Sequence, residues 1–295
     1  RDAYVEFGGG LVFAKFAGGG AREAARRLFN GARSLQFRAL RRWGRPRLSV
    51  VVIAYNMARE LPRTIRSLSP SMQQGVSADD YEIILVDNGS TAPFDAPGLK
   101  ALAPNILIRR QANATVSPVP AINAGLDMAR GDLVGVFIDG ARMASPGLLA
   151  AALAAAETSR AEPVIGALAF HLGPEVQMQS CRKGYNQATE DRLLAALEWE
   201  RDGYRLFEGS VFAGSSAGGW HALPAETNAL FLRRAYWRRL GGYDPQFRSS
   251  GGGFANLDIW RRLCDDPAND VIMLLGEGTF HQVHGGVATN APAPR

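Results

Sequence analysis

The sequence predicts an α/β protein with a mostly parallel β-sheet that is flanked by helices. Short apolar runs rich in β-branched residues, such as LSVVVIA at 48–54 and YEIILVD at 81–87, have the length and composition of buried strands. They alternate with segments in which apolar residues recur at helical spacing, as at 58–69. Strands that are joined by crossover helices run parallel, so this alternation predicts a parallel sheet.

The first 172 residues supply most of these elements. The helix at 145–159 has the clearest start, because Ser145 is a favoured N-cap and Pro146 fits the first helical position. We expect further helices at 58–69 and within 117–130, and strands at 48–56, 81–90, 105–111, 131–140 and 163–172.

Beyond residue 172 the pattern is less regular. A helix is expected within 189–207, with Thr189 as its cap, and residues 210–220 are expected to form a loop. The other expected elements are a strand and helix within 226–244, a Gly-rich loop and helix within 251–266, and a strand that begins near 270 and runs into a polar, histidine-bearing segment.

Composition and charge exclude two classes of protein. No apolar run is long enough to span a bilayer. The net charge of +5 comes from residues 1–47, which hold 11 basic and 3 acidic residues, whereas the rest holds 22 and 25. A body without excess positive charge is not a nucleic-acid-binding surface, so no nucleic acid partner is expected. Two cysteines fit free thiols in a reducing, cytoplasmic compartment.

The basic N-terminal segment, residues 1–47, contains an amphipathic stretch at 21–43 in which arginines and apolar side chains recur at helical spacing. Such a helix either lies on an anionic membrane surface or packs on the main domain with its arginines solvated. Peripheral contact with a membrane through 21–43 is therefore one expectation.

Polar side chains gather where the predicted strands end. Tyr55 and Asn56 follow the first strand, Asp87 and Asn88 end the second, and Asp139 ends the strand at 131–140. Ligands of parallel α/β sheets bind at the carboxyl ends of the strands, so these side chains predict a ligand site.

Four motifs in order resemble the family 2 inverting glycosyltransferases, which have the GT-A fold. The motifs are SVVVIAYNMARELPRTIRSL, YEIILVDNGST, AINAGLDMARGDLVGVFIDG and LRRAYWRRLGGYDPQFRSSGGGFANLDIWRRL, and together they span 48–263. The resemblance implies a glycosyltransferase domain at 48–295. Within it, 48–145 would form the nucleotide-sugar half, 146–285 the acceptor half and 286–295 a tail.

The resemblance also implies roles on the nucleotide side. Ala54, Tyr55 and Asn56 would line the pocket of the nucleobase, and Asp87 would accept a hydrogen bond from the base. Asn123 and Asp139 would face the ribose and the diphosphate. The alternative for 87–89 is a simple turn, since Asn-Gly favours turns by itself.

The family's Asp-x-Asp metal motif is divergent here, because Ala141 stands where an acid would bind a divalent metal. Arg142 could hold the diphosphate bidentately in place of the metal, or it could point to solvent or pair with an acid. Alternatively, His281 and His284 could hold Mn²⁺ or Mg²⁺ together with Asp139, or bind phosphates directly when protonated. The need for a metal cofactor is thus open at this point.

The catalytic base is the second departure. Inverting transfer needs a carboxylate that takes the proton of the acceptor hydroxyl. The family's Glu-Asp-x-Asp stretch reads Ala-Asn-Leu-Asp at 255–258. Asp258 is the first candidate and Glu226 the second, while Asn256 could orient the acceptor. The alternatives are an acid that stabilises a helix N-terminus at Asp258 and a surface carboxylate at Glu226.

We therefore expect an enzyme that transfers a sugar, with inversion, from a nucleotide-diphosphate sugar to a glycan or glycolipid acceptor. Assembly of envelope polysaccharide in a bacterium, at the inner membrane face, fits this activity by analogy. The alternative is a non-catalytic GT-A-like module that binds a nucleotide or a glycan. A nucleotidyltransferase is disfavoured, because no Gly-rich phosphate loop with Arg or Lys follows the first strand.

Overall fold

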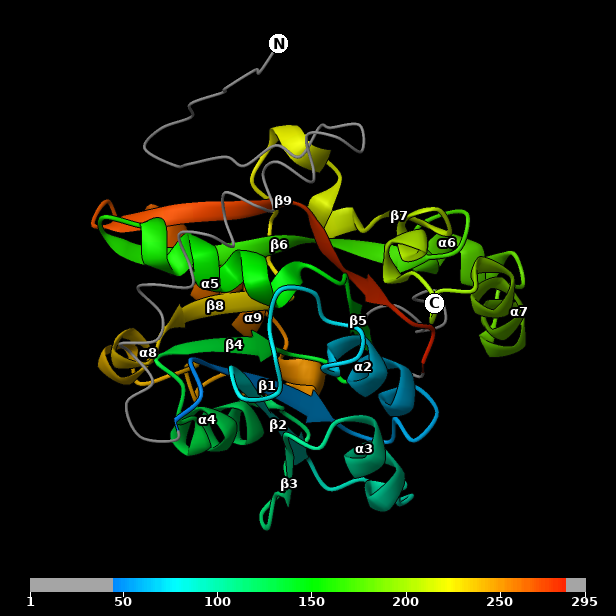
Figure 1. Cartoon of the computed structure of the whole chain (residues 1–295), viewed down its shortest axis with the longest axis horizontal. Coiled ribbons are helices and arrows are strands. Elements are labelled where there is room, and N and C mark those ends of the chain that lie inside the picture. Colours follow the sequence, from blue (N-terminus) through cyan, green and yellow to red (C-terminus); the bar gives the residue numbers. More distant parts are fainter. Residues whose placement is uncertain (1–44, 285–295) are drawn as a thin grey trace.

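The computed structural model describes residues 45–284. Nine strands form one sheet in the order β3-β2-β1-β4-β8-β6-β9-β5, with β7 paired to β6 (Figure 1). Because one sheet runs through both halves of the chain, the two halves share a continuous scaffold. The expectations for the segment at 21–43 lie outside the described residues.

The first four strands in this order are parallel, as the alternation of strands and helices predicts. β1 (Leu48–Ala54) lies between β2 (Tyr81–Asp87) and β4 (Leu133–Phe137), and β3 (Ile106–Arg110) extends the edge beyond β2. Ala54 pairs in register with Asp87, so the ends of β1 and β2 are level. The polar residues that follow these strands therefore share one edge of the sheet.

The other strands form a mixed half. β8 (Ala229–Arg233) runs antiparallel to both β4 and β6 (Glu162–Leu172) and joins the halves. β9 (Asn269–His281) runs parallel to β6. The short strands β5 (Arg142–Ala144) and β7 (Ser210–Phe212) run antiparallel to β9 and β6.

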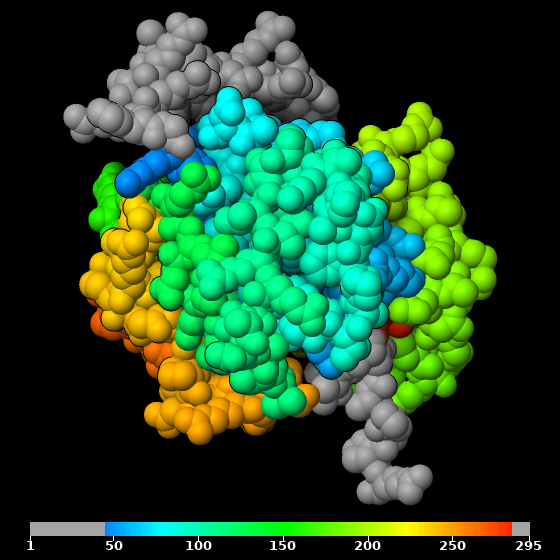
Figure 2. Space-filling view, turned by 90° about the horizontal axis from the view of Figure 1, so that it is seen from below, coloured from blue at the N-terminus to red at the C-terminus, as the bar shows by residue number. Residues whose placement is uncertain are grey.

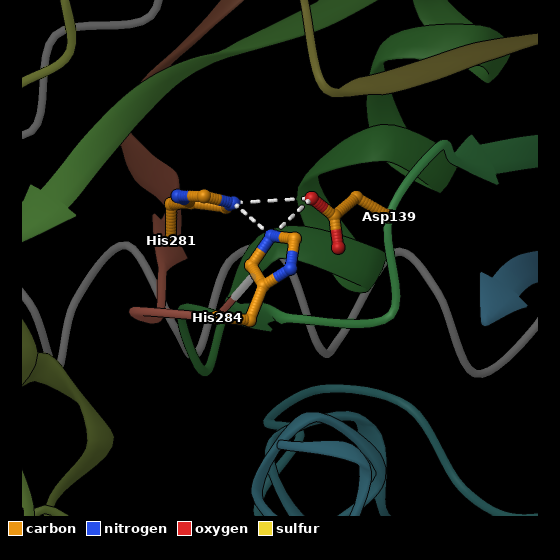
Figure 3. Close-up of side chains that lie close together, drawn as sticks. All are labelled: Asp139, His281 and His284. Atoms are coloured by element: carbon orange, nitrogen blue, oxygen red, sulfur yellow. Dashed lines mark hydrogen bonds and ion pairs between the residues drawn. The ribbon is translucent and has the colours of Figure 1, made fainter. Parts of the chain in front are cut away.

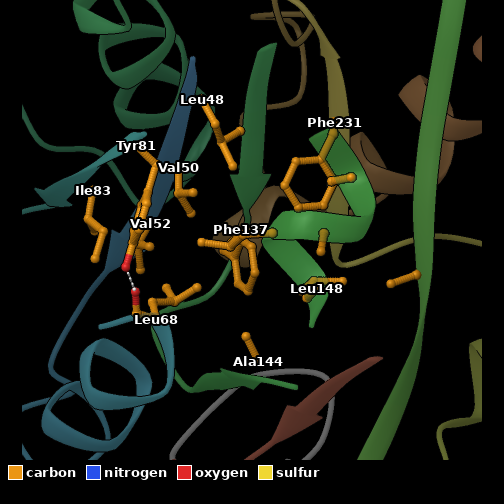
Figure 4. Close-up of a cluster of buried hydrophobic side chains, with 14 of the residues drawn as sticks. Leu48, Val50, Val52, Leu68, Tyr81, Ile83, Phe137, Ala144, Leu148 and Phe231 are labelled. Atoms are coloured by element: carbon orange, nitrogen blue, oxygen red, sulfur yellow. Dashed lines mark hydrogen bonds between the residues drawn. The ribbon is translucent and has the colours of Figure 1, made fainter. Parts of the chain in front are cut away.

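Helices cover both faces of the sheet, so the strands are apolar on both sides. Alternate side chains of β1 enter two different cores. One core lies under α2 (Leu61–Leu68), α3 (Ala96–Leu102) and α5 (Leu148–Thr158), and Figure 4 shows part of it. The second lies under α4 (Val119–Met128), α8 (Arg234–Leu240) and α9 (Ala255–Asp265).

Two further helices, α6 (Gln177–Arg182) and α7 (Gln187–Leu197), form a segment at one side of the molecule. Figure 2 shows this segment in yellow-green beside the parallel half, with the end of the described chain in red between them. Short 3₁₀ turns occur at Gly203–Phe207, Gly214–Ser216, Gly219–His221 and Ser250–Gly252.

Several local expectations were wrong. α5 begins at Leu148 rather than next to Ser145, whose hydroxyl donates to the buried Glu277 at 2.7 Å instead of capping a helix. The N-cap of α7 is Asn186, whose side chain accepts from the Thr189 N–H. Residues 210–212 form β7 rather than loop.

Four elements had not been expected as strand or helix, namely β5, β7, α3 and α6. Both cysteines are free thiols, as expected. Within 45–284 no helix combines the length and the apolar character that crossing a bilayer requires.

Candidate active site

Three side chains that the sequence singled out as metal ligands meet at the carboxyl end of the sheet. Asp139 follows β4, His281 ends β9, and His284 lies three residues further on (Figure 3). Asp139 Oδ2 is 3.0 Å from His281 Nε2 and 3.2 Å from His284 Nε2, and the two Nε2 atoms are 3.0 Å apart. Three ligand atoms therefore converge on one point.

The orientation of His281 is fixed by Gln177 of α6. The Gln177 amide N–H donates to the His281 carbonyl at 2.9 Å, so its oxygen faces Nδ1 of the ring at 2.5 Å. A carboxamide oxygen only accepts hydrogen bonds, so Nδ1 carries the ring proton. Nε2 of His281 thus presents a lone pair to Asp139, as metal-binding histidines do.

This donor set fits a divalent cation. The lone pair of His281 Nε2 and the carboxylate of Asp139 are both acceptors, and a cation or a proton must lie between them. Mn²⁺ and Mg²⁺ accept imidazole and carboxylate ligands, and adjacent ligands of an octahedral ion at about 2.1 Å lie about 3.0 Å apart. The separations of 3.0–3.2 Å match this value.

The protonation of the three groups follows from their contacts. Burial by itself would raise the pKa of Asp139, but the charge of His284 and the hydrogen bond from its ring hold it well below its ordinary value. Burial and the charge of Arg142 lower the pKa of His281 to about 3. Burial opposes protonation of His284, yet Asp139 outweighs it and raises the pKa of His284. His284 is thus the proton carrier when no metal is bound.

Arg142 enters the same site because β5 pairs with β9 and places it in register with His281. Only 9% of Arg142 is exposed, and its Nε and Nη1 have no hydrogen-bond partner among residues 45–284. Burial lowers the pKa of the guanidinium, which the carboxylates of Asp139 and Glu226 partly oppose. Arg142 therefore does not point to solvent.

His171 is a site residue that the sequence reasoning missed. It lies near the end of β6, in register with His281 on β9, and the two rings are 5.7 Å apart. Burial and the charge of Arg142 lower the pKa of His171 to about 4. The chain has only four histidines, and this scarcity could have drawn attention to His171. Because His171 lies within an apolar strand, its sequence context indicates a core residue instead.

A surface hollow reaches one of the three ligands. It reaches His284 and is lined otherwise by Val283 and by residues of the α6–α7 segment, namely Cys181, Tyr185, Asn186, Gln187 and Ala188. The buried Glu190 of α7 accepts the N–H of Val283 at 2.8 Å and so holds this end of the chain against the segment. His284 is therefore the ligand that this hollow exposes.

The expected nucleotide residues lie at the ends of β1 and β2. Ala54 is buried beside Asp87, while the ring of Tyr55 is 51% exposed. Asn56 adopts a positive φ of 52° and accepts the N–H of Thr91 at 2.8 Å, which ties the two strand ends together. Asp87 accepts the N–H of Ser90 at 2.9 Å, as a turn residue does, and also faces Arg110 at 3.4 Å.

Asn123 is placed differently from the other expected nucleotide residues. Its amide forms a reciprocal pair with the backbone of Tyr243, donating to the carbonyl and accepting from the N–H, both at 2.9 Å. Both ends of the amide are thus used to join α4 to the turn after α8.

The two candidate bases differ sharply in environment. Glu226 acts electrostatically on the buried Arg142, and its carboxylate accepts from Asn256 Nδ2 at 2.9 Å. Asn256 is itself held by the Thr227 carbonyl at 2.9 Å and the Tyr243 hydroxyl at 3.3 Å. Asp258, one turn into α9, instead pairs with Arg262 at 2.8 Å. The structure brings Glu226 and Asn256 together and leaves Asp258 in a helix ion pair.

Comparison with known proteins identifies the family. The family model of glycosyl transferase family 2 matches residues 49–238. No curated protein matches the chain by sequence. S. aureus TarS 1-349 in complex with UDP-GlcNAc is 15% identical, with a TM-score of 0.54 over 83% of this chain and 61% of that one. GalNAc-T7 with UDP, GalNAc and Mn²⁺ is 16% identical, with a TM-score of 0.52 over 84% and 45%.

At these identities the solved structures show the fold. The chain spans about 60% of the length of the TarS 1-349 structure. The family match covers more than half of the sequence, and the sheet and its flanking helices are those of the matched structures. The chain therefore belongs to glycosyl transferase family 2 and has the GT-A fold.

Proposed function

We propose that the chain transfers a sugar from a nucleotide-diphosphate sugar to a hydroxyl of a glycan or glycolipid acceptor, with inversion at the anomeric carbon. One observation carries the proposal. A set of three ligands that fits a divalent cation lies beside a buried cation, Arg142, on which the carboxylate of Glu226 also acts electrostatically. TarS bound to UDP-GlcNAc and GalNAc-T7 bound to UDP and Mn²⁺ have the same fold.

The nucleotide would bind at the ends of β1 and β2. The exposed ring of Tyr55 offers a face for the base, and the buried Ala54 precedes it at the end of β1. Asp87 keeps Oδ2 on the side of Arg110, where the carboxylate can accept a base N–H. Asn56 holds the loop after β2 in place and so shapes the rim of this pocket.

The metal site would lie under the diphosphate. Asp139, His281 and His284 would hold Mn²⁺ or Mg²⁺, which supplies positive charge to the diphosphate as it leaves. Arg142 adds a second, permanent positive charge beside it. The missing acid at Ala141 is thus replaced by imidazole ligands.

Glu226 is the base that the geometry favours over Asp258. Its carboxylate would take the proton of the acceptor hydroxyl as the oxygen attacks the anomeric carbon. The bond from that carbon to the diphosphate breaks in the same step, and the nucleoside diphosphate leaves with the bonding electrons. Asn256, which the sequence analysis assigned to the acceptor, would act by holding the Glu226 carboxylate.

A thermal-shift titration tests the donor. The protein is titrated with UDP, GDP, dTDP and CDP and with their common sugars, once with Mn²⁺ or Mg²⁺ and once with EDTA. A ligand at a hundredfold excess over its dissociation constant should stabilise the fold by about 2.7 kcal/mol. We expect a shift that needs the metal and is lost in H281A. No shift with any donor would overturn the proposal and favour a module that binds glycan alone.

The positive charge of the N-terminal segment supports a glycolipid acceptor and contact with a membrane surface. Residues 1–47 carry the chain's excess positive charge, which suits an anionic membrane surface that bears a glycolipid acceptor. Co-sedimentation with phosphatidylglycerol vesicles tests this part of the proposal. Binding that disappears when 1–47 is removed supports it, and equal binding of both proteins contradicts it.

A further inference from the structure

Arg142 and His171 flank His281 in one row across three neighbouring strands. Arg142 on β5 is the register partner of His281 on β9, and His281 is the register partner of His171 on β6. Side chains of register partners lie on the same face of a sheet. The guanidinium and the His171 ring therefore stand on the face that carries the candidate metal ligands, one on each side of His281.

The charge of Arg142 is not satisfied by the part of the chain that the structure describes. Its Nε and Nη1 are buried and have no hydrogen-bond partner there. Asp139 and Glu226 act on the guanidinium electrostatically, and neither forms a hydrogen bond with it. A buried charge without hydrogen bonds is strongly destabilising, so this arrangement indicates a position for an anionic ligand.

His171 supplies a neutral donor on the other side of His281. Its Nδ1 accepts the backbone N–H of Gln177 at 3.0 Å. A ring nitrogen that accepts a hydrogen bond carries no proton, so the ring hydrogen of His171 is on Nε2. No contact of Nε2 with residues 45–284 uses this hydrogen. Nε2–H is thus free to donate to a ligand oxygen.

We propose that Arg142 and His171, one on each side of His281, together form a binding site for an anionic oxygen group of the sugar donor. The inference rests on the proposed transfer reaction and adds His171 and the kind of group that is bound. Two parts of a donor carry such oxygens: the phosphate that is released, and the carboxylate of a donor sugar that is a uronic acid. The guanidinium recognises either group bidentately.

Paired variants of His171 separate ligand binding from a structural role. The amide oxygen of H171N can replace Nδ1 as acceptor for Gln177, but this variant loses the donor at Nε2. The amide nitrogen of H171Q can replace the Nε2 donor, but this variant loses the acceptor at Nδ1. We expect H171N to weaken ligand binding about fivefold and H171Q to retain it. A merely structural role predicts the reverse order.

Arg142 is tested with R142M, with R262M as the control, because Arg262 lies in a surface ion pair with Asp258. R142M should weaken binding about tenfold to a hundredfold, since a charge-assisted hydrogen bond is lost. Without ligand, however, R142M should melt at a higher temperature than the wild-type protein, because a buried unpaired charge has been removed. R262M should change neither quantity.

The probes distinguish the two sources of the anion. Dissociation constants are measured calorimetrically, with Mn²⁺, for UDP and GDP, and for UDP-glucose against UDP-glucuronate. If R142M and H171N lose the same factor of affinity for UDP, UDP-glucose and UDP-glucuronate, the site binds the phosphate that is released. If these variants lose affinity for UDP-glucuronate alone, the site binds the carboxylate of the sugar.

Two results would overturn the proposal. If R142M and H171N bind all probes as the wild-type protein does, the site is refuted and the proposed transfer stands. If the wild-type protein binds none of the probes, the proposed function fails together with this site.

Discussion

Moving the catalytic carboxylate from Glu226 to position 256 is the sharpest test of how this site works. Glu226 Oε2 and Asn256 Nδ2 are 2.9 Å apart, so the two side chains reach the same place from different elements. In E226Q the base is lost. In E226Q/N256D the carboxylate is on residue 256, one hydrogen-bond length from the original position of the Glu226 carboxylate. The new amide of residue 226 can donate a hydrogen bond to it. The pair thus keeps its hydrogen bond with the direction reversed, while the bond from residue 256 to the Thr227 carbonyl is lost.

The magnitudes follow from general base catalysis. A positioned base contributes about 10²–10⁴-fold, so E226Q should lower kcat by about that factor at unchanged donor affinity. A misplacement of about 1 Å can cost about 10² in rate. E226Q/N256D should therefore recover at least about tenfold over E226Q without reaching the wild-type rate. Release of UDP or GDP from nucleotide sugars, with alkyl glycosides as acceptors, measures these rates.

D258N is the matched control, because Asp258 pairs with Arg262 at 2.8 Å on a partly exposed helix face. An exposed pair of this kind contributes less than about 1 kcal/mol to stability, so D258N should keep both its fold and its kcat. The reasoning is refuted if D258N loses about 10² in kcat while E226Q is unaffected. It is also refuted if E226Q/N256D fails to improve on E226Q although both variants bind donor normally.

Three further outcomes are expected. Q177L should weaken calorimetric Mn²⁺ binding about 10–100-fold, because His281 loses the partner that fixes its tautomer, and should also lower the melting temperature, because the buried carbonyl and Nδ1–H of His281 lose their partners; unchanged affinity would contradict this. N123A should lower the free energy of unfolding in urea by about 2 kcal/mol, since two backbone groups of Tyr243 lose partners, and nucleotide affinity should stay the same; a large loss of affinity would instead place the amide at the nucleotide. Burial raises the pKa of Glu190 to about 7, so the folded state keeps a proton that the unfolded state loses above the ordinary glutamate pKa of 4.5. Stability should therefore fall by about 2–3 kcal/mol as the pH rises from 5 to 8, relative to E190Q, in urea unfolding at each pH; parallel pH profiles would disprove it.

The parallel half of the fold was predictable because its signals are local. β1, β2 and β4 are continuous apolar runs, and the polar residues at their ends follow directly from where each run stops. The convergence of Asp139, His281 and His284 was also predictable, since the histidines lie in a polar segment after a strand. Strand ends can be read from composition alone, and they locate a site in a parallel sheet.

The rest of the site depends on pairing between distant segments. β5 is three residues long and exists because β9, more than a hundred residues later, pairs with it. No local sequence pattern predicts such a short strand, so the orientation of Arg142 could not be predicted from the sequence. His171 lies in an apolar strand and reads as a core residue until register places it beside His281. Register depends on the whole sheet and has no local signature.

In the proposed site both departures from the family pattern would have the same physical form, since a group missing on one element would be replaced from the element that lies against it. The backbone carbonyl of Ala141 accepts the N–H of Gln282 at 2.9 Å, so the missing acid faces the stretch that carries His281 and His284. Asn256 is in the same way hydrogen-bonded to Glu226. The absence of two acids from a motif therefore does not predict an inactive site here. What the chemistry needs is ligand atoms and a carboxylate at given points, and a mixed sheet can supply them from more than one strand.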